Sequence, residues 1–343
     1  MPMFNLTKII RPNILTLEPY SSARDEFKGS EGIFLDANEN PFGSLNRYPD
    51  PLQKSVKQKL SEVKNVPAEN IFLGNGSDEI IDLCYRIFCE PGKDKALTFV
   101  PTYGMYEVSA AINNVELIKL PLNSDFQIDT KSCKTYLKDT DVKLIFICSP
   151  NNPTGNIINN IEYILENFNG VVVVDEAYID FAGSNSLSAK LDNYPNLIVL
   201  QTLSKAWGLA AARMGIAFAS TEIIIYLNKV KPPYNMSSPN QQAALNALDD
   251  LEIYQNQLAT ILSEKEKMLN AFADISIITK VYPTDANFIL IKVKDADKAY
   301  NQLINKNIIL RNRSKVVADC LRITIGTPQE NEALLSAFKN IQL

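Results

Sequence analysis

A lysine and an arginine stand eight residues apart in the stretch TLSKAWGLAAARMG (202–215). The apolar run before this stretch predicts a buried strand, and the small residues after Lys205 predict a closely packed helix. An isolated lysine is most often a solvated surface residue. A lysine that follows a buried strand can instead be a nucleophile that condenses with a carbonyl group. The preceding strand and the step to Arg213 favour this second interpretation.

The sequence contains no histidine. This absence excludes Ser-His-Asp and Cys-His catalysis and the H-E-x-x-H zinc sites. If the protein is an enzyme, its protons must be carried by Lys, Asp, Glu, Tyr or Cys side chains or by a cofactor. A metal bound at Asp175 would need further ligands, and only Glu176 and Asp180 stand near it in the sequence. We therefore expect no metal site.

Composition indicates a cytoplasmic protein. The five cysteines are odd in number and form no C-x-x-C pair, which is typical of reduced, buried thiols. The net charge is −5, and the sequence shows no cluster of basic residues of the kind that binds nucleic acid. No apolar run reaches the length of a membrane span, and the first residues lack the apolar centre of a signal peptide. We expect neither nucleic acid nor a membrane as a partner.

Short apolar runs alternate with helical patterns from about residue 51 to residue 215. This alternation predicts an α/β fold, with a mostly parallel sheet that is covered by helices on both faces. The pattern changes after the proline-rich stretch KPPYNMSSP (231–239). One long helix over 240–273 and a few later strands predict a smaller α+β domain. The expected parts are an N-terminal segment belonging to the small domain (1–44), a large domain (45–235) and a C-terminal small domain (236–343).

Polar side chains directly follow the predicted strands of the large domain. In open α/β sheets, ligands bind beyond the carboxyl ends of the strands. We therefore expect one site built from the residues that follow five strands: Gly74–Asp78, Tyr103, Asn152, Asp175 with Tyr178, and Thr202 with Ser204 and Lys205.

This set of groups suits a pyridine-ring cofactor that carries an aldehyde and a phosphate arm. The lysine would condense with the aldehyde, and the carboxylate would keep the ring nitrogen protonated. A phenol and an amide could bond the ring oxygen, while an aromatic side chain stacks on the ring face. Hydroxyls, a helix N-terminus and an arginine could hold the phosphate.

Motifs along nearly the whole chain strengthen this interpretation. Together they resemble the pyridoxal-phosphate aminotransferases of fold type I, most closely the histidinol-phosphate aminotransferases. The matching stretches are LEPYSSAR (17–24), LDANENPFG (35–43), NRYPD (46–50), GNGSDEIID (74–82), PTYGMY (101–106), SPNNPTG (149–155), DEAYIDF (175–181), TLSKAWGLAAARMG and CLRITIGT (320–327).

The resemblance implies a role for each matching residue. Lys205 would hold pyridoxal 5'-phosphate covalently and move the Cα proton, and Asp175 would pair with the ring nitrogen. The ring oxygen would be bonded by Tyr178 and Asn152, with Tyr103 stacked on the ring. The remaining cofactor contacts would come from Gly76, Ser77, Asp78, Thr202, Ser204 and Arg213, and from Tyr48 of a second subunit in a homodimer with shared active sites.

The substrate side of the predicted site depends on two arginines. By resemblance, Arg311 and Arg322 would bind a substrate phosphate, although Arg313 competes for that role. Arg322 could also hold the α-carboxylate of glutamate. Tyr20 and Asn38 would lie near the substrate.

The implied activity is transamination of histidinol phosphate with 2-oxoglutarate, which gives imidazole-acetol phosphate and glutamate in histidine biosynthesis. An aromatic amino acid aminotransferase and a pyridoxal-phosphate-dependent decarboxylase of a phosphorylated amino acid remain alternatives. An NAD-dependent dehydrogenase is disfavoured, because Glu79 replaces the third glycine of G-x-G-x-x-G. A catalytically silent binding protein would not need the lysine, aspartate and tyrosine set. Trp207 is interpreted as a packing residue.

Overall fold

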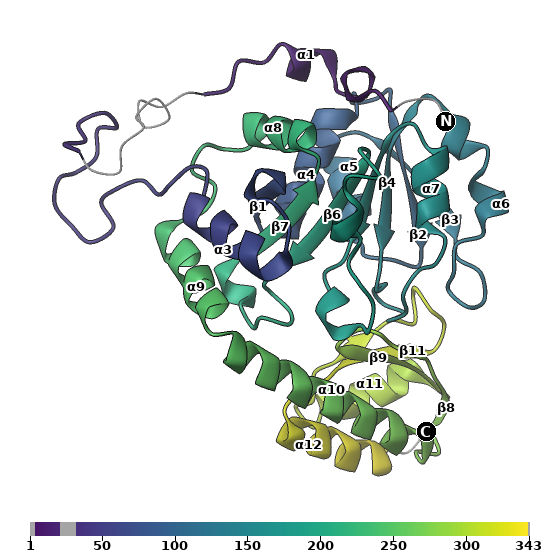
Figure 1. Cartoon of the computed structure of the whole chain (residues 1–343). Helices are drawn as coiled ribbons and strands as arrows, with labels where there is room; N and C mark the ends of the chain where they lie inside the picture. The colour runs from purple at the N-terminus through teal and green to yellow at the C-terminus, as the bar shows by residue number, and fades with distance from the viewer. Residues whose placement is uncertain (1–3, 21–31, 342–343) are drawn as a thin grey trace.

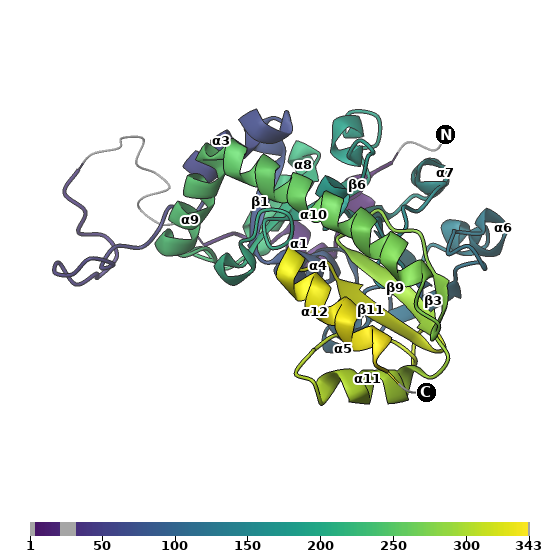
Figure 2. The same cartoon turned by 90° about the horizontal axis from the view of Figure 1, so that it is seen from below.

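The computed structural model describes residues 4–20 and 32–341 (Figure 1). A large sheet with its helices forms one unit, and a smaller sheet with its own helices lies beside it (Figures 1 and 2). Among the helices of these described ranges, none combines the length and the apolar character that crossing a bilayer requires.

The large sheet has seven strands in the order β1-β7-β6-β5-β4-β2-β3. Neighbouring strands from β3 to β6 run parallel, whereas β7 is antiparallel to both β6 and β1. The sheet is therefore mostly parallel, as the sequence predicts. Its strands are β1 (Ile71–Asn75), β2 (Lys95–Val100), β3 (Glu116–Pro121), β4 (Val142–Cys148), β5 (Val171–Asp175), β6 (Leu197–Thr202) and β7 (Met214–Ala219).

Both faces of the large sheet are buried, which explains why its central strands are continuously apolar. Successive side chains of a strand point to opposite faces. Val171 and Val173 accordingly join one hydrophobic cluster, while Val172 and Val174 join the other. The first cluster packs against α4 (Ser77–Phe88), α5 (Met105–Ile112) and α8 (Thr221–Val230), and the second against α3 (Lys54–Lys64), α7 (Ile161–Asn167) and α9 (Ser238–Asp249). The short helix α6 (Thr130–Cys133) lies between β3 and β4 in the chain.

The smaller unit contains an antiparallel sheet in the order β10-β11-β9-β8. Its strands are β8 (Ile278–Val281), β9 (Phe288–Val293), β10 (Arg311–Asn312) and β11 (Cys320–Thr324). Residues of α10 (Leu251–Ala273), α11 (Ala296–Ile304) and α12 (Pro328–Lys339) share its hydrophobic core.

The expected long helix over 240–273 is two helices, α9 and α10. The break falls at Asp250, whose carboxylate accepts a hydrogen bond from Ile253 N at 3.2 Å and so caps α10. This side-chain bond offers the backbone an alternative to a continuous helix. Beyond the break, α10 runs from the large unit to the small one (Figure 1).

The N-terminal residues are divided between two locations. Ile10 and Ile14, beside and within α1 (Pro12–Leu15), are buried in the cluster that contains α4 and α8, so this stretch packs on the large unit. Residues 32–49 form an arm that extends away from the body (Figure 1). The last four residues of the LEPYSSAR motif, 21–24, lie outside the described residues.

Candidate active site

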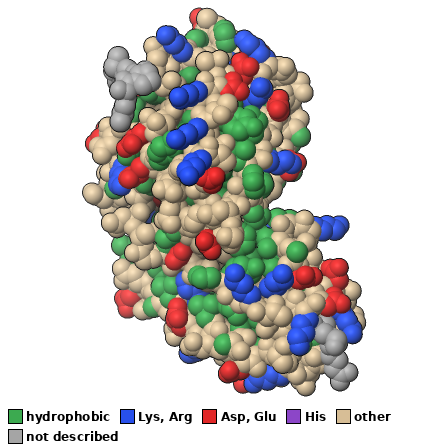
Figure 3. Space-filling model, turned by 90° about the vertical axis from the view of Figure 1, so that its right-hand side faces the viewer, with side chains coloured by type: hydrophobic (Ala, Val, Ile, Leu, Met, Phe, Trp, Pro, Cys, Tyr) green, Lys and Arg blue, Asp and Glu red, His purple; other side chains and the backbone are tan. Residues whose placement is uncertain are grey.

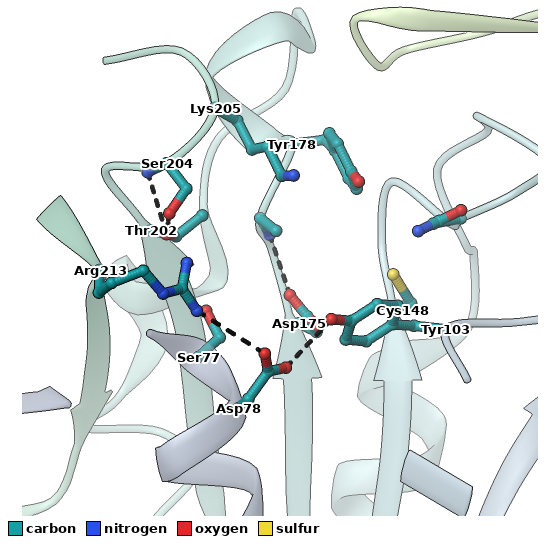
Figure 4. Close-up of a pocket in the computed structure, with 12 residues that line it drawn as sticks. Ser77, Asp78, Tyr103, Cys148, Asp175, Tyr178, Thr202, Ser204, Lys205 and Arg213 are labelled. Carbon is teal, nitrogen blue, oxygen red and sulfur yellow. Dashed lines mark hydrogen bonds and ion pairs between the residues drawn. The ribbon is translucent and has the colours of Figure 1, made fainter. Parts of the chain in front are cut away.

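A pocket opens where the strands of the large sheet end (Figure 4). Its lining gathers residues that are far apart in the sequence, because the carboxyl ends of parallel strands meet at one edge of a sheet. The lining residues are Ser77, Asp78, Tyr103, Cys148, Asn152, Asp175, Ala177, Tyr178, Thr202, Ser204, Lys205 and Arg213.

Lys205 lies on a loop between β6 and β7. The expected helix after Lys205 is instead a series of turns with one short 3-10 helix at Ala210–Ala212. The loop is closed at its base, where Leu203 N donates to Met214 O and Leu209 N donates to Leu203 O. This closure carries the chain directly into the antiparallel strand β7.

The Lys205 side chain points into the pocket, and its ammonium lies 5.8 Å from the centre of the Tyr178 ring (Figure 4). Partial desolvation by the pocket walls lowers the pKa of Lys205, and the positive charge of Arg322 lowers it further. Asp175 acts in the opposite direction. A lysine whose pKa is lowered has more neutral amine at pH 7, which is the form that attacks a carbonyl carbon.

Asp175 ends β5 and is almost completely buried, with 3% of its surface exposed. One carboxylate oxygen accepts a hydrogen bond from Ala177 N at 3.1 Å, and the other accepts one from the Tyr106 hydroxyl at 2.8 Å. Burial raises the pKa of Asp175, while these two hydrogen bonds lower it. A buried carboxylate of this kind is stabilised by a cationic partner such as a protonated ring nitrogen.

The other end of the pocket is suited to a phosphate group. α4 begins at Ser77, so its free N-terminal N–H groups lie at this end of the pocket. Gly76 precedes the helix with φ of +78°, and a Cβ atom there would lie 2.5 Å from Arg213 Nη2. Thr202 Oγ1 contacts Met214 O at 3.0 Å and accepts from Ser204 N at 3.1 Å. Backbone N–H groups, hydroxyls and one guanidinium thus surround a small space.

Aromatic and amide groups form the remaining wall. The Tyr103 hydroxyl donates to Asp78 Oδ1 at 3.0 Å, which holds the ring beside the pocket (Figure 4). Asn152 is buried, and its Oδ1 accepts a hydrogen bond from Arg322 Nη1. This bond joins a residue of the small unit to the pocket of the large one.

The candidate substrate arginines lie on the hairpin of β10 and β11. Arg311 and Arg322 are paired across the two strands, and the Arg322 guanidinium lies 5.1 Å from the Phe288 ring centre. The Nε atoms of Arg313 and Arg322 are buried and have no hydrogen-bond partner among the described residues. Buried donors of this kind normally have a partner, so an anionic ligand would satisfy them.

The family described as aminotransferase class I and II matches residues 24–338. The chain belongs to that family. It is 52% identical to the histidinol-phosphate aminotransferase of Cytophaga hutchinsonii, over 98% of this chain and 99% of the relative. It is also 52% identical to the protein of the same name from Christiangramia forsetii, over 100% and 99% of the two chains. The solved structure of the histidinol-phosphate aminotransferase of Clostridium acetobutylicum superposes with a TM-score of 0.78 at 26% identity, over 87% and 91%.

Six of the expected residues do not line the pocket of this aminotransferase chain. Gly76 directly precedes the lining residue Ser77, and Arg311 and Arg322 line a separate cavity beside α12. The other three lie on the N-terminal segment and the arm. Tyr20 and Asn38 are exposed residues of the N-terminal segment and the arm. Tyr48 is half exposed, and its ring stacks on Tyr234 at a centroid distance of 4.4 Å. Both Tyr48 and Asn38 line a separate surface hollow between the arm and the start of α9.

Sequence reasoning also missed residues that belong to the pocket or support it. Cys148 and Ala177 line the pocket. Tyr106 does not line it, but its hydroxyl donates a hydrogen bond to Asp175. Cys148 is the last residue of β4, so its place at a strand end was a usable signal. Tyr106 lies one turn after Tyr103 in PTYGMY, but an aromatic residue at helical spacing is typical of a core position.

Proposed function

We propose that this chain transfers the amino group of histidinol phosphate to 2-oxoglutarate, giving imidazole-acetol phosphate and glutamate. This reaction would place it in histidine biosynthesis. The observation that carries the proposal is the pocket in which Lys205, Asp175 and the space beside Arg213 come together. The names of relatives that are half identical over their full length support the choice of substrate.

Pyridoxal 5'-phosphate, when bound, supplies an aldehyde and a ring that accepts the electron pair released at the substrate Cα. Lys205 would hold this group through its amine and would carry the proton at the substrate Cα. Asp175 pairs with the ring nitrogen and keeps it protonated. The hydroxyls of Ser77, Thr202 and Ser204, with Arg213, bind the phosphate arm and fix its position.

The arginines on the β10–β11 hairpin would give this aminotransferase its preference for anionic substrates. Arg322 contacts Asn152 at the pocket, and Arg313 lies close enough to interact electrostatically with both Arg322 and Tyr178. Arg311 adds a third positive charge. Burial lowers the pKa of Arg322, and the charge of Arg311 lowers it further. A substrate phosphate would neutralise this repulsion. The carboxylates of glutamate would be held at the same place in the second half-reaction.

We also propose a homodimer in which Tyr48 reaches the cofactor phosphate of the other subunit. The arm presents Ile33, Leu35 and Phe42 to solvent with 92%, 88% and 81% of their surfaces exposed. Large apolar side chains that are exposed on one segment are a feature of contact surfaces, and a second copy of the chain would cover them. The cytoplasm is the expected compartment, because five buried free cysteines suit a reducing environment.

Cofactor attachment is the first test of this proposal. The purified protein, supplied with pyridoxal 5'-phosphate, should become yellow, and borohydride should fix the cofactor on the peptide that contains Lys205. Lys205→Ala should leave no fixed cofactor in the same peptide map. A protein that stays colourless and gains no activity with pyridoxal 5'-phosphate would refute the function.

Substrate choice is the second test. Histidinol phosphate should be a far better amino donor to 2-oxoglutarate than phenylalanine, and no CO₂ should be released. Arg322→Met should raise KM for histidinol phosphate by about 30-fold or more, since it removes a partly buried charge from an ion pair. Arg86→Met, at a surface arginine paired with Asp82, is the matched control and should leave KM unchanged. Equal turnover of both donors would contradict the assignment of the arginines.

A further inference from the structure

Tyr106 is the one phenol that contacts the buried carboxylate of Asp175 in the described structure. Its hydroxyl donates to Asp175 Oδ2 at 2.8 Å, and its side chain has no exposed surface. The other oxygen of Asp175 accepts from Ala177 N. Each carboxylate oxygen thus accepts one hydrogen bond from the protein. Its remaining lone pairs can accept a hydrogen bond from a ligand in the pocket that Asp175 lines.

The position of the Tyr106 ring is determined by its surroundings. It stacks on Phe146 at a centroid distance of 5.0 Å and meets Tyr103 edge to face at 5.6 Å. The phenol is therefore held towards Asp175, because its ring packs against other aromatic rings and has no exposed surface.

We propose that Tyr106 is a positioning residue for the aminotransferase, which holds the Asp175 carboxylate in a fixed orientation towards the pocket and stabilises it as an anion. This inference rests on the proposed function. Tyr106 never reaches the pocket itself, so it acts only through Asp175.

The charge balance around Asp175 explains why such a donor is needed. Asp175 loses the stabilisation of water on burial, and the positive charge of Lys205 exerts the smallest of the effects that favour the charged form of Asp175. A hydrogen bond donated to an ionised group is stronger than one between neutral groups. Burial also raises the pKa of Tyr106, so this phenol stays protonated and remains a donor over the working pH range.

Tyr106→Phe removes the donor and keeps the ring. Asp175 Oδ2 then loses its donor, so the charged carboxylate is less stabilised and the pKa of Asp175 rises further. More of Asp175 is then the neutral acid, which is no counter-ion for the ring nitrogen. Affinity for pyridoxal 5'-phosphate should fall by about 10-fold or more, the effect of losing a hydrogen bond to a charged group. The pH at which the bound cofactor's absorbance changes should shift as well, and kcat should fall with little change in KM for the donor.

Tyr85→Phe is the matched control. It removes the same atom at the same depth, from a hydrogen bond that ends on the backbone of Tyr106 instead of Asp175. The wild-type protein and both variants are titrated with pyridoxal 5'-phosphate by absorbance and equilibrium dialysis. A wild-type protein that takes up no cofactor refutes the proposed function. A wild-type protein that binds it normally, with Tyr106→Phe unchanged in affinity and pH profile, refutes the role of Tyr106. Equal changes in both variants also refute it, because they indicate a packing effect.

Discussion

Gly215 is not a site residue, yet its size should control cofactor binding. It is the second residue of β7, where it pairs with Gly74 of β1 and Thr202 of β6. A Cβ atom on residue 215 would lie 2.4 Å from Gly76 C and Ser77 N, the peptide at the start of α4. The obstructing atoms are backbone, so no side-chain rotation can relieve the contact.

The size of the effect of Gly215→Ala follows from this geometry. Carbon atoms in normal contact lie about 3.5–4.0 Å apart, so the strand and the helix start must separate by about 1 Å. Overpacking of this kind costs about 1–3 kcal/mol of stability. A displacement of about 1 Å at a catalytic group can lower activity about 100-fold. We therefore expect Gly215→Ala to weaken binding of pyridoxal 5'-phosphate by one to two orders of magnitude.

Binding can be measured by absorbance titration of the cofactor-free protein, and stability by urea unfolding of the same sample. Gly104→Ala is the control, because a Cβ atom at residue 104 meets nothing within 4 Å and φ of residue 104 is −68°. Both its stability and its cofactor affinity should stay close to those of the wild type. If Gly215→Ala bound pyridoxal 5'-phosphate as tightly as the wild type, the proposed phosphate site at the start of α4 would be wrong.

Three further predictions concern single residues. Burial and the neighbouring Lys231 lower the pKa of Lys57 to about 8, so folding disfavours its charged form and stability should rise from pH 8 to 10.5. Lys57→Met should flatten that rise and add up to about 3 kcal/mol to the unfolding free energy at pH 7. Urea titrations at several pH values would measure both effects, and an unchanged dependence of stability on pH would contradict the prediction. Asp175→Asn should keep the shape of the site but lower kcat about 100- to 1000-fold, because the charge opposite the ring nitrogen is lost, and a kcat near wild type would exclude that charge from the mechanism. Trp207 is the sole tryptophan of the chain and stands two residues after Lys205, so its emission should fall as pyridoxal 5'-phosphate is added, and a constant emission would argue against cofactor binding beside it.

The large sheet could be predicted because its strands are buried on both faces. A run such as Val171–Val174 has no polar face, and only a helix-covered sheet explains several such runs in one chain. β7 is not predicted because its sequence, MGIAFA, begins within the motif TLSKAWGLAAARMG, whose small residues favour a helix. In the structure, β7 forms antiparallel hydrogen bonds with both β6 and β1, and these tertiary contacts outweigh the local preference for a helix.

The pocket residues could be predicted better than the contacts that hold them. Asp175 and Lys205 follow strands, and the position of a strand end can be read from the sequence. The bond from Tyr106 to Asp175 joins residues 69 positions apart. It depends on where α5 lies over β5, which no local pattern reports. Trp207 was expected to pack, and it stacks on Tyr254 at a centroid distance of 3.9 Å.

The hydrogen bond between Arg322 and Asn152 has a consequence for how two ligands affect one another. Arg322 belongs to the proposed substrate site, and Asn152 belongs to the cofactor pocket. An anion that binds Arg322 and breaks this hydrogen bond would free the Asn152 oxygen. The Asn152 amide could then bond the cofactor differently. Thermodynamic linkage then requires the converse, in which bound cofactor changes the affinity for the anion by the same factor. A single side-chain contact between the two units thus makes the free energies of cofactor and substrate binding interdependent.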